Sequence, residues 1–267
     1  MSKRPFQPNL ARAWVDSMVK GAPPACSFSS DADPATSDTT DLASDHEPTW
    51  RVRDGLFGLV IALGGAFVSS GVLALLFKVG GVKHLQDSTG FNFSATFVQE
   101  AVFVVTALLF AYFSGGVTPA KFGLRRFKPS ALGWVALAFV LYLAISAIYA
   151  NLAHPPKDQL PSSFGVDQSA LLAVATGVLV IGVAPFVEEF FFRGFIFSAL
   201  RDGIGVWGGA VLSGAIFAAI HLKPQFFVPL MVLGVVLALL YQRTESLWPS
   251  IILHATNNAL VFVYLIS

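Results

Sequence analysis

Charged residues are scarce in this sequence. Asp, Glu, Lys and Arg make up 12% of the 267 residues, whereas 55% are hydrophobic and the mean hydropathy is +0.68. A typical soluble domain carries about 25% charged residues. The composition therefore excludes an ordinary soluble domain and predicts a protein that crosses a membrane several times. The formal net charge of +1 gives no indication of nucleic-acid binding.

Cysteine is nearly absent as well, since Cys26 is the only one in the chain. An internal disulfide and a cysteine metal site are therefore excluded. The segment 1–54 lacks the uninterrupted apolar core of a signal peptide and is rich in Ser, Thr and Asp instead. It buries too little apolar surface to offset the entropy cost of ordering. We predict a disordered tail at residues 1–54 and a transmembrane helical domain at residues 55–267.

The rest of the chain contains repeated apolar runs of about 20 residues, the length that a helix needs to cross a hydrocarbon core of about 30 Å. The fold class that follows is an all-α bundle of about seven transmembrane helices, with a range of six to eight. The expected spans are 55–77, 95–114, 131–152, 169–200, 205–221, 226–241 and 247–266. The fourth is too long for a straight span, and its Pro185 favours a kink.

The positions of the basic residues predict the orientation, because cytoplasmic loops carry an excess of Lys and Arg. The loop between the second and third spans holds Lys121, Arg125, Arg126 and Lys128, whereas the alternate loops carry fewer basic residues. We therefore expect an integral multi-pass protein with a cytoplasmic amino terminus, in the cytoplasmic membrane if the chain is prokaryotic. The sequence does not indicate an oligomeric state.

One stretch places charge inside an apolar run. Glu188, Glu189 and Arg193 lie within the fourth expected span. A charged side chain near a bilayer centre costs about 2.5 to 3.5 kcal/mol on insertion scales, so such residues usually face a bundle interior and serve a function. Glu189 and Arg193 are four residues apart, which suits an ion pair on one helix face. Glu188 points about 100° away and is left free for a substrate or a water.

Further polar residues from the carboxy-terminal half fall at a similar depth. With a rise of 1.5 Å per residue, Glu188, His221, His254 and Asn258 lie at about 18, 24, 10 and 17 Å from the cytoplasmic ends of their helices. Such convergence is expected of a site in a bundle core. Glu188 and His221 could polarise a water, alone or through a metal. His254 and Asn258, again four residues apart, could donate hydrogen bonds to an oxyanion.

These motifs together resemble the CPBP intramembrane proteases, which include the Rce1-type CAAX prenyl endopeptidases and the bacterial Abi proteins. The resemblance rests on Glu188-Glu189-x-x-x-Arg193, Phe217-x-x-x-His221 and His254-x-x-x-Asn258, with support from Phe122-Gly123-Leu124-Arg125-Arg126, Gly234, Tyr241, Thr244 and Ser246-Leu247. It covers a protease-like core at about 121–267.

The resemblance implies a function for each of these residues. Glu188 would be the base that activates water, Glu189 and Arg193 its supporting pair, and His221 its partner. His254 and Asn258 would be the oxyanion donors. The expected reaction is peptide-bond hydrolysis in a membrane-embedded or lipidated peptide. Zinc or another divalent metal on Glu188, His221 and His254 is left open, although no His-Glu-x-x-His pair is present.

Other interpretations stay open at the level of sequence. Glu189 with Arg193 could be a structural ion pair only, and Asn258 a helix-packing amide. Glu100 is expected near the membrane interface, with a place in the cavity as the alternative. A catalytically inactive scaffold or chaperone would carry the same residues if it kept them for packing. A proton-coupled transporter also uses Glu and His in a bundle, but the sequence shows no internal duplication of the kind common in such folds.

Overall fold

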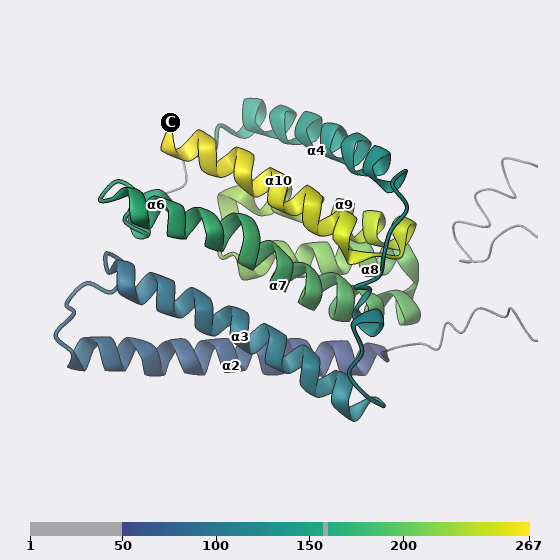
Figure 1. Cartoon of the computed structure of the whole chain (residues 1–267), viewed down its shortest axis with the longest axis horizontal. Coiled ribbons are helices and arrows are strands. Elements are labelled where there is room, and N and C mark those ends of the chain that lie inside the picture. Colours follow the sequence, from purple (N-terminus) through teal and green to yellow (C-terminus); the bar gives the residue numbers. More distant parts are fainter. Residues whose placement is uncertain (1–49, 157–159) are drawn as a thin grey trace, which may run out of the picture. The chain divides into compact units, whose positions relative to one another are not determined.

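The computed structural model describes residues 50–156 and 160–267, and within these ranges the chain is helical with no strands (Figure 1). The α-helices are α2 (Val52–Val79), α3 (Thr89–Phe113), α4 (Ala131–Ala153), α5 (Leu160–Ser163), α6 (Ala170–Gly177), α7 (Ala184–Phe191), α8 (Ser198–Ile220), α9 (Phe227–Thr244) and α10 (Leu247–Ile266). Short 3-10 turns, η1 (Pro119–Phe122) and η4 (Pro224–Phe226), and π-helical segments, η2 (Val178–Val183) and η3 (Phe192–Phe197), link them.

The predicted all-α membrane fold is confirmed. Among the described residues, six helices are long and apolar enough to cross a membrane, and the chain is an integral multi-pass protein. The predicted tail lies outside the described residues up to position 49. Its last residues already belong to α2, which begins at Val52, earlier than the expected 55. The reason is a cap: the carboxylate of Asp54 accepts a hydrogen bond of 3.0 Å from the backbone N–H of Arg51.

The fourth membrane segment is helical from Ala170 to Ile220, which is 51 residues. At 1.5 Å per residue such a helix would measure about 76 Å, far more than one crossing needs. Gly205 interrupts it with φ 79° and ψ 167°. After this break the chain approaches its own preceding turn, because a Cβ on Gly209 would lie 2.8 Å from the backbone nitrogen of Arg201. The expected fourth and fifth spans, 169–200 and 205–221, are the two arms on either side of this break.

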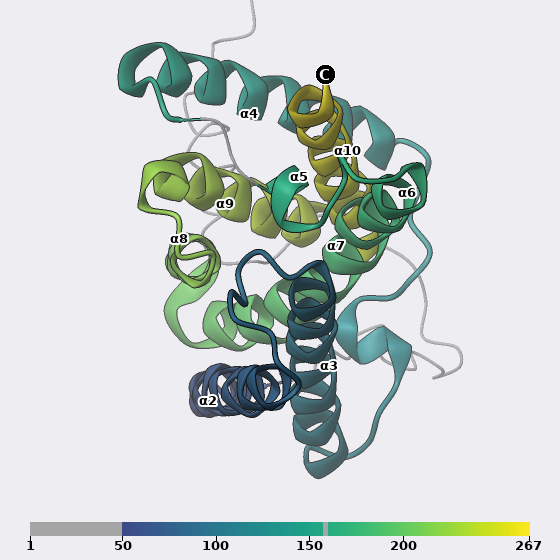
Figure 2. The same ribbon diagram turned by 90° about the vertical axis from the view of Figure 1, so that its left-hand side faces the viewer.

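Helix α7 occupies the middle of the bundle. Figure 2 shows it with α3 and α2 on one side and with α10 and α4 on the other, and α7 packs directly on α3 and α10. Aromatic side chains fill its contact with α3 and η1: Phe103 stacks on Phe191 with ring centroids 4.7 Å apart, and Phe122 stacks on Phe190 at 4.1 Å. Phe190, Phe191 and Phe192 are all buried, so they are packing residues of the core.

The segment before α4 docks onto the turn between α9 and α10. The backbone N–H of Leu247 donates to the carbonyl of Gly123 at 2.8 Å, and the hydroxyl of Ser246 donates to the carbonyl of Arg125 at 2.7 Å. Gly123 has φ +77°, and a Cβ at this position would lie 2.5 Å from the ring of Tyr241. Only glycine fits both the backbone conformation and the space.

The orientation can be tested with single cysteines in a Cys26→Ser background. Gln86, between α2 and α3, and Ser130, directly before α4, are both exposed. Figure 1 shows the α2–α3 loop and the start of α4 at opposite ends of the helices. If the amino terminus is cytoplasmic, a membrane-impermeant maleimide should label Gln86→Cys in intact cells and should label Ser130→Cys only after the membrane is opened. Labelling of Ser130→Cys in intact cells would reverse the predicted orientation.

Candidate active site

The two glutamates stand on a short α-helix between two π-helical segments. In η2 the backbone N–H of Ala184 donates to the carbonyl of Leu179, a bond across five residues. The same pattern would pair the carbonyl of Val180 with the nitrogen of Pro185, which carries no hydrogen. The side-chain amide of Asn258 supplies the missing donor, with Nδ2 at 2.9 Å from the Val180 oxygen. The donor that Pro185 lacks is therefore replaced by one from α10. This bond attaches α10 to the start of α7, the helix that carries both glutamates.

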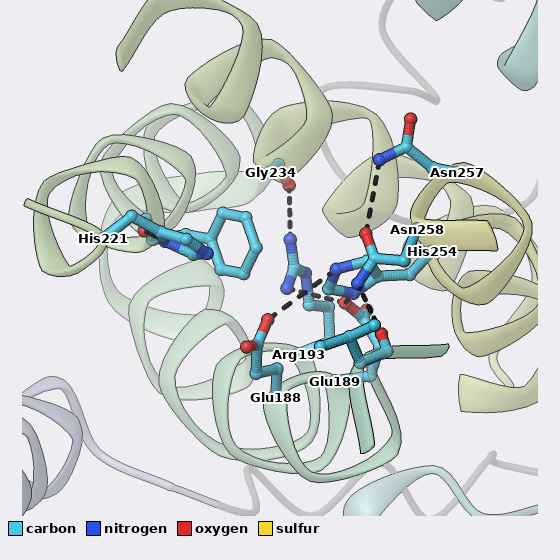
Figure 3. A network of polar contacts seen from close by, with 10 residues as sticks. Glu188, Glu189, Arg193, His221, Gly234, His254, Asn257 and Asn258 are labelled. Carbon is cyan, nitrogen blue, oxygen red and sulfur yellow. Dashed lines mark hydrogen bonds and ion pairs between the residues drawn. The ribbon is translucent and has the colours of Figure 1, made fainter. Parts of the chain in front are cut away.

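Glu189 is the centre of a buried charged network, which Figure 3 shows. Its Oε1 accepts a hydrogen bond of 2.8 Å from Nη1 of Arg193 and one of 2.9 Å from Nδ1 of His254. Nη2 of Arg193 donates to the backbone carbonyl of Gly234 at 3.2 Å. Both members of the ion pair have 0% side-chain exposure. The expected Glu189–Arg193 ion pair is present. Its hydrogen bonds join the continuous helix α7–η3 to α9 and α10.

Glu188 lies on the accessible side of this network. Its side chain is 14% exposed, and its Oε2 lies 3.7 Å from Nε2 of His254. Because Nδ1 of His254 donates to Glu189, its Nε2 can act as a donor only when the ring carries both protons. The imidazole is then held between two carboxylates, one on each nitrogen. Glu188 itself receives no hydrogen bond at Oε2 from the described part of the chain.

His221 lies beside the network at the end of α8. Its Nδ1 is 2.7 Å from the carbonyl oxygen of Phe217, so this nitrogen carries the hydrogen and Nε2 keeps a free lone pair. The ring of Phe217 contacts both histidines, with its centroid 4.7 Å from that of His221 and 5.7 Å from that of His254. Phe217 also supports the guanidinium of Arg193, which lies 4.7 Å from the ring centroid.

Asn258 is on the same side of α10 as His254, one turn later. One N–H of its amide binds Val180, as described above, and the second is available for another acceptor. Its Oδ1 accepts a weak hydrogen bond of 3.4 Å from Nδ2 of Asn257. The expected oxyanion donor is thus fixed in place by backbone and side-chain contacts.

The metal ligands expected from the sequence are Glu188, His221 and His254. Within residues 50–156 and 160–267, no group of three or more His, Cys, Asp or Glu side chains could hold a metal ion. Glu188 and His254 are adjacent. Nδ1 of His254 is hydrogen-bonded to Glu189 and Nδ1 of His221 to the carbonyl of Phe217, which leaves the Nε2 atoms as the nitrogens that could bind a metal. The residues as placed do not form a complete ligand set, and the metal stays a prediction.

Several contributors to the site were not identified as such from the sequence. Gly234 allows α9 to approach α8 closely, since a Cβ on it would lie 2.6 Å from the Cα of Gly214, and this contact brings its carbonyl to Arg193. Trp50 is fully buried and donates from its indole nitrogen to the carbonyl of Gly194 at 3.2 Å. The glycine pair could have been found as small residues on adjacent apolar helices, whereas the contact of Trp50 leaves no local pattern.

Lys121, in the segment between α3 and α4, contacts the same tryptophan. Its ammonium group donates to the carbonyl of Ser114 at 2.8 Å and lies 4.8 Å from the ring centroid of Trp50. Partial burial lowers the pKa of Lys121 below its ordinary value, because desolvation disfavours the charged form. The loop that contains Lys121 is therefore fixed to both α3 and the residue that supports Gly194.

Comparison with known proteins supports the motif-based resemblance. Residues 169–260 match the family model described as Type II CAAX prenyl endopeptidase Rce1-like, and this stretch contains every candidate residue given above. A protein of Bacillus subtilis (strain 168) named "Putative membrane peptidase YdiL" is 31% identical over 81 residues. The match covers 30% of this chain and 33% of that protein, so the chain matches about a third of the relative's length. No solved structure matches.

The ion pair makes a prediction about stability. Replacing Arg193 with Leu leaves the carboxylate of Glu189 buried without its guanidinium, and breaking a buried pair typically costs about 3 to 5 kcal/mol. Thermal unfolding in detergent should show a clear loss of stability for Arg193→Leu. The matched control is Arg201→Leu, because Arg201 pairs with Asp202 in a partly exposed position and such pairs contribute about 0 to 1 kcal/mol. Equal melting temperatures for the two variants would contradict the stabilising role of Arg193.

Proposed function

We propose that the chain is an intramembrane endopeptidase of the CAAX-protease type, starting from the match of residues 169–260 to the Rce1-like family model. The observation that carries this proposal is the position of Glu188. Its side chain is 14% exposed, its Oε2 lies 3.7 Å from Nε2 of His254, and it directly precedes Glu189 of the fully buried ion pair. A fixed carboxylate beside imidazoles is suited to general-base activation of water.

The proposed reaction is hydrolysis of a peptide bond. Glu188 accepts a proton from a water whose oxygen attacks the carbonyl carbon, while the free Nε2 of His221 accepts a hydrogen bond that orients this water. The carbonyl oxygen becomes an oxyanion, and it accepts hydrogen bonds from the second amide N–H of Asn258 and from Nε2–H of His254, whose ring carries both protons in this step. The carbon–nitrogen bond then breaks, and the proton passes from Glu188 to the departing nitrogen. This regenerates the carboxylate.

The substrate class follows from the surroundings of the site. The residues lie on helices that cross the membrane, so a substrate must reach them from within the bilayer or from its surface. A membrane-embedded or prenylated peptide satisfies this requirement, and the family description points to prenylated carboxy termini. We propose such peptides as substrates. An inactive scaffold and a proton-coupled transporter are the alternatives that the experiments below separate.

Activity should depend on the proposed residues in a graded way. In a cleavage assay with a fluorogenic farnesylated peptide that ends in a CAAX sequence, Glu188→Gln and His221→Ala should abolish hydrolysis, because both act on the water. Asn258→Ala should reduce kcat by about 10² to 10³ and leave measurable turnover, as expected for one lost oxyanion donor.

Glu245→Gln provides the control for this series. Glu245 is exposed at the end of α9, so the same chemical change there should leave cleavage at the wild-type rate. Thermal unfolding of each variant separates loss of chemistry from loss of structure. Cleavage by Glu188→Gln at the wild-type rate would overturn the protease proposal and favour the scaffold or the transporter.

Chelation addresses the predicted divalent metal. Because the described residues form no complete ligand set, water activation by Glu188 and His221 alone is the primary proposal, and 1,10-phenanthroline or EDTA should leave the cleavage rate unchanged. Loss of activity that zinc restores would instead assign Glu188, His221 and His254 as ligands. Direct metal analysis of the purified protein provides the independent measurement.

A further inference from the structure

Glu100 is a buried carboxylic acid in the middle of α3, and none of the proposed chemistry uses it. Only 4% of the residue is exposed. The expectation of an interfacial position is wrong, because α3 begins at Thr89 and not near residue 95. The earlier start places Glu100 about 17 Å from the beginning of its helix, which is mid-membrane depth.

Glu100 lies at the level of Glu188. Helices α3 and α7 pack against each other and run in the same direction (Figures 1 and 2). Phe103 of α3 stacks on Phe191 of α7. Glu100 and Glu188 each lie three residues, about one turn, before these stacked rings. A residue of the first helix pair therefore faces the base of the candidate site.

The carboxyl of Glu100 lacks the compensation that Glu189 has. Glu189 is bound by Arg193 and His254. Oε2 of Glu189 and Oε2 of Glu100 are both buried without a hydrogen-bond partner among the described residues, but of the two carboxyl groups Glu189 is compensated at its other oxygen by a guanidinium and an imidazole. A buried polar atom without a partner costs free energy, so such groups usually bind something. Oε2 of the neighbouring Glu188 is likewise buried without a hydrogen-bond partner among the described residues.

We propose that Glu100 is a substrate-positioning residue whose carboxyl hydrogen-bonds a backbone amide of the peptide being cleaved. This inference rests on the proposed function. A peptide that presents its scissile carbonyl to the water at Glu188 also presents backbone N–H groups one residue away, and these are the donors that Glu100 lacks. In this arrangement the helix pair α2–α3, which lies outside the matched residues 169–260, completes the site from the opposite side.

A comparison of Glu100→Leu and Glu100→Gln tests this role with the farnesylated reporter peptide. Glu100→Leu removes the acceptor and should raise KM about tenfold or more while kcat changes little, because the lost hydrogen bond to a polar or charged group is made in the bound ground state. Glu100→Gln keeps an acceptor oxygen and should restore the wild-type KM. Thr106→Val, a change at another buried polar residue of α3, should alter neither constant.

Three results would overturn the proposal. They are an unchanged KM in Glu100→Leu, a KM raised equally in Glu100→Leu and Thr106→Val, and a fall of kcat in Glu100→Gln to the level of Glu188→Gln. The last result would make Glu100 a proton-transfer residue. Melting temperatures measured in parallel identify any variant whose KM changes because the helix packing has changed.

A labelling experiment separates failure of this inference from failure of the proposed function. In a Cys26→Ser background, Glu100→Cys should react with a small cationic methanethiosulfonate reagent at a rate similar to Glu188→Cys, whereas Phe103→Cys, one turn along α3, should not react. If the wild type does not cleave the reporter, the proposed function fails, and the labelling still decides on Glu100. Absence of labelling at position 100 while position 188 reacts would show that Glu100 does not face the site.

Discussion

The buried pair of Arg193 and Glu189 is the interaction on which the rest of the site depends. Charge at this depth is tolerated only when it is compensated, and every compensating contact comes from a different helix: His254 from α10 and the carbonyl of Gly234 from α9. The buried ion pair therefore binds two other helices, α9 through Arg193 and α10 through Glu189. Glu188 obtains a defined position as the neighbour of this fixed group, while its own side chain stays partly accessible.

Backbone irregularity is the second constraint, because hydrocarbon offers no hydrogen bonds to an unpaired carbonyl. The π-helical segments on both sides of α7 each leave a carbonyl that needs a donor. Before the glutamates, the amide of Asn258 donates to the backbone carbonyl of Val180. After them, the hydroxyl of Ser198 donates to the backbone carbonyl of Arg193. Asn258 thereby supplies the hydrogen bond that is missing at the start of the helix that carries Glu188 and Glu189. Structure and site are specified together, which explains why a proline is tolerated at position 185.

Local spacing made part of this predictable. The interval of four residues indicated the Glu189–Arg193 pair, and Gly205 marked the break between two arms of the long segment. Contacts between distant segments were not predictable in the same way. The depth of Glu100 depends on where α3 begins, and the contact of Trp50 with Gly194 joins residues 144 positions apart. His254 was expected as an oxyanion donor or a metal ligand, yet its Nδ1 also binds Glu189, because packing of α10 on α7 decides that contact.

The same network distinguishes between the functional classes. A proton-coupled transporter has to open its charged site to each side of the membrane in turn, usually by moving one half of the bundle against the other. Here Glu189, Arg193 and His254 join α7, α9 and α10 through hydrogen bonds with almost no exposure, so relative movement of these helices would expose or separate a buried ion pair. A hydrolase needs the opposite property, since its base and oxyanion donors must stay in fixed positions while the substrate changes. The rigidity of this network therefore favours chemistry at a stationary site.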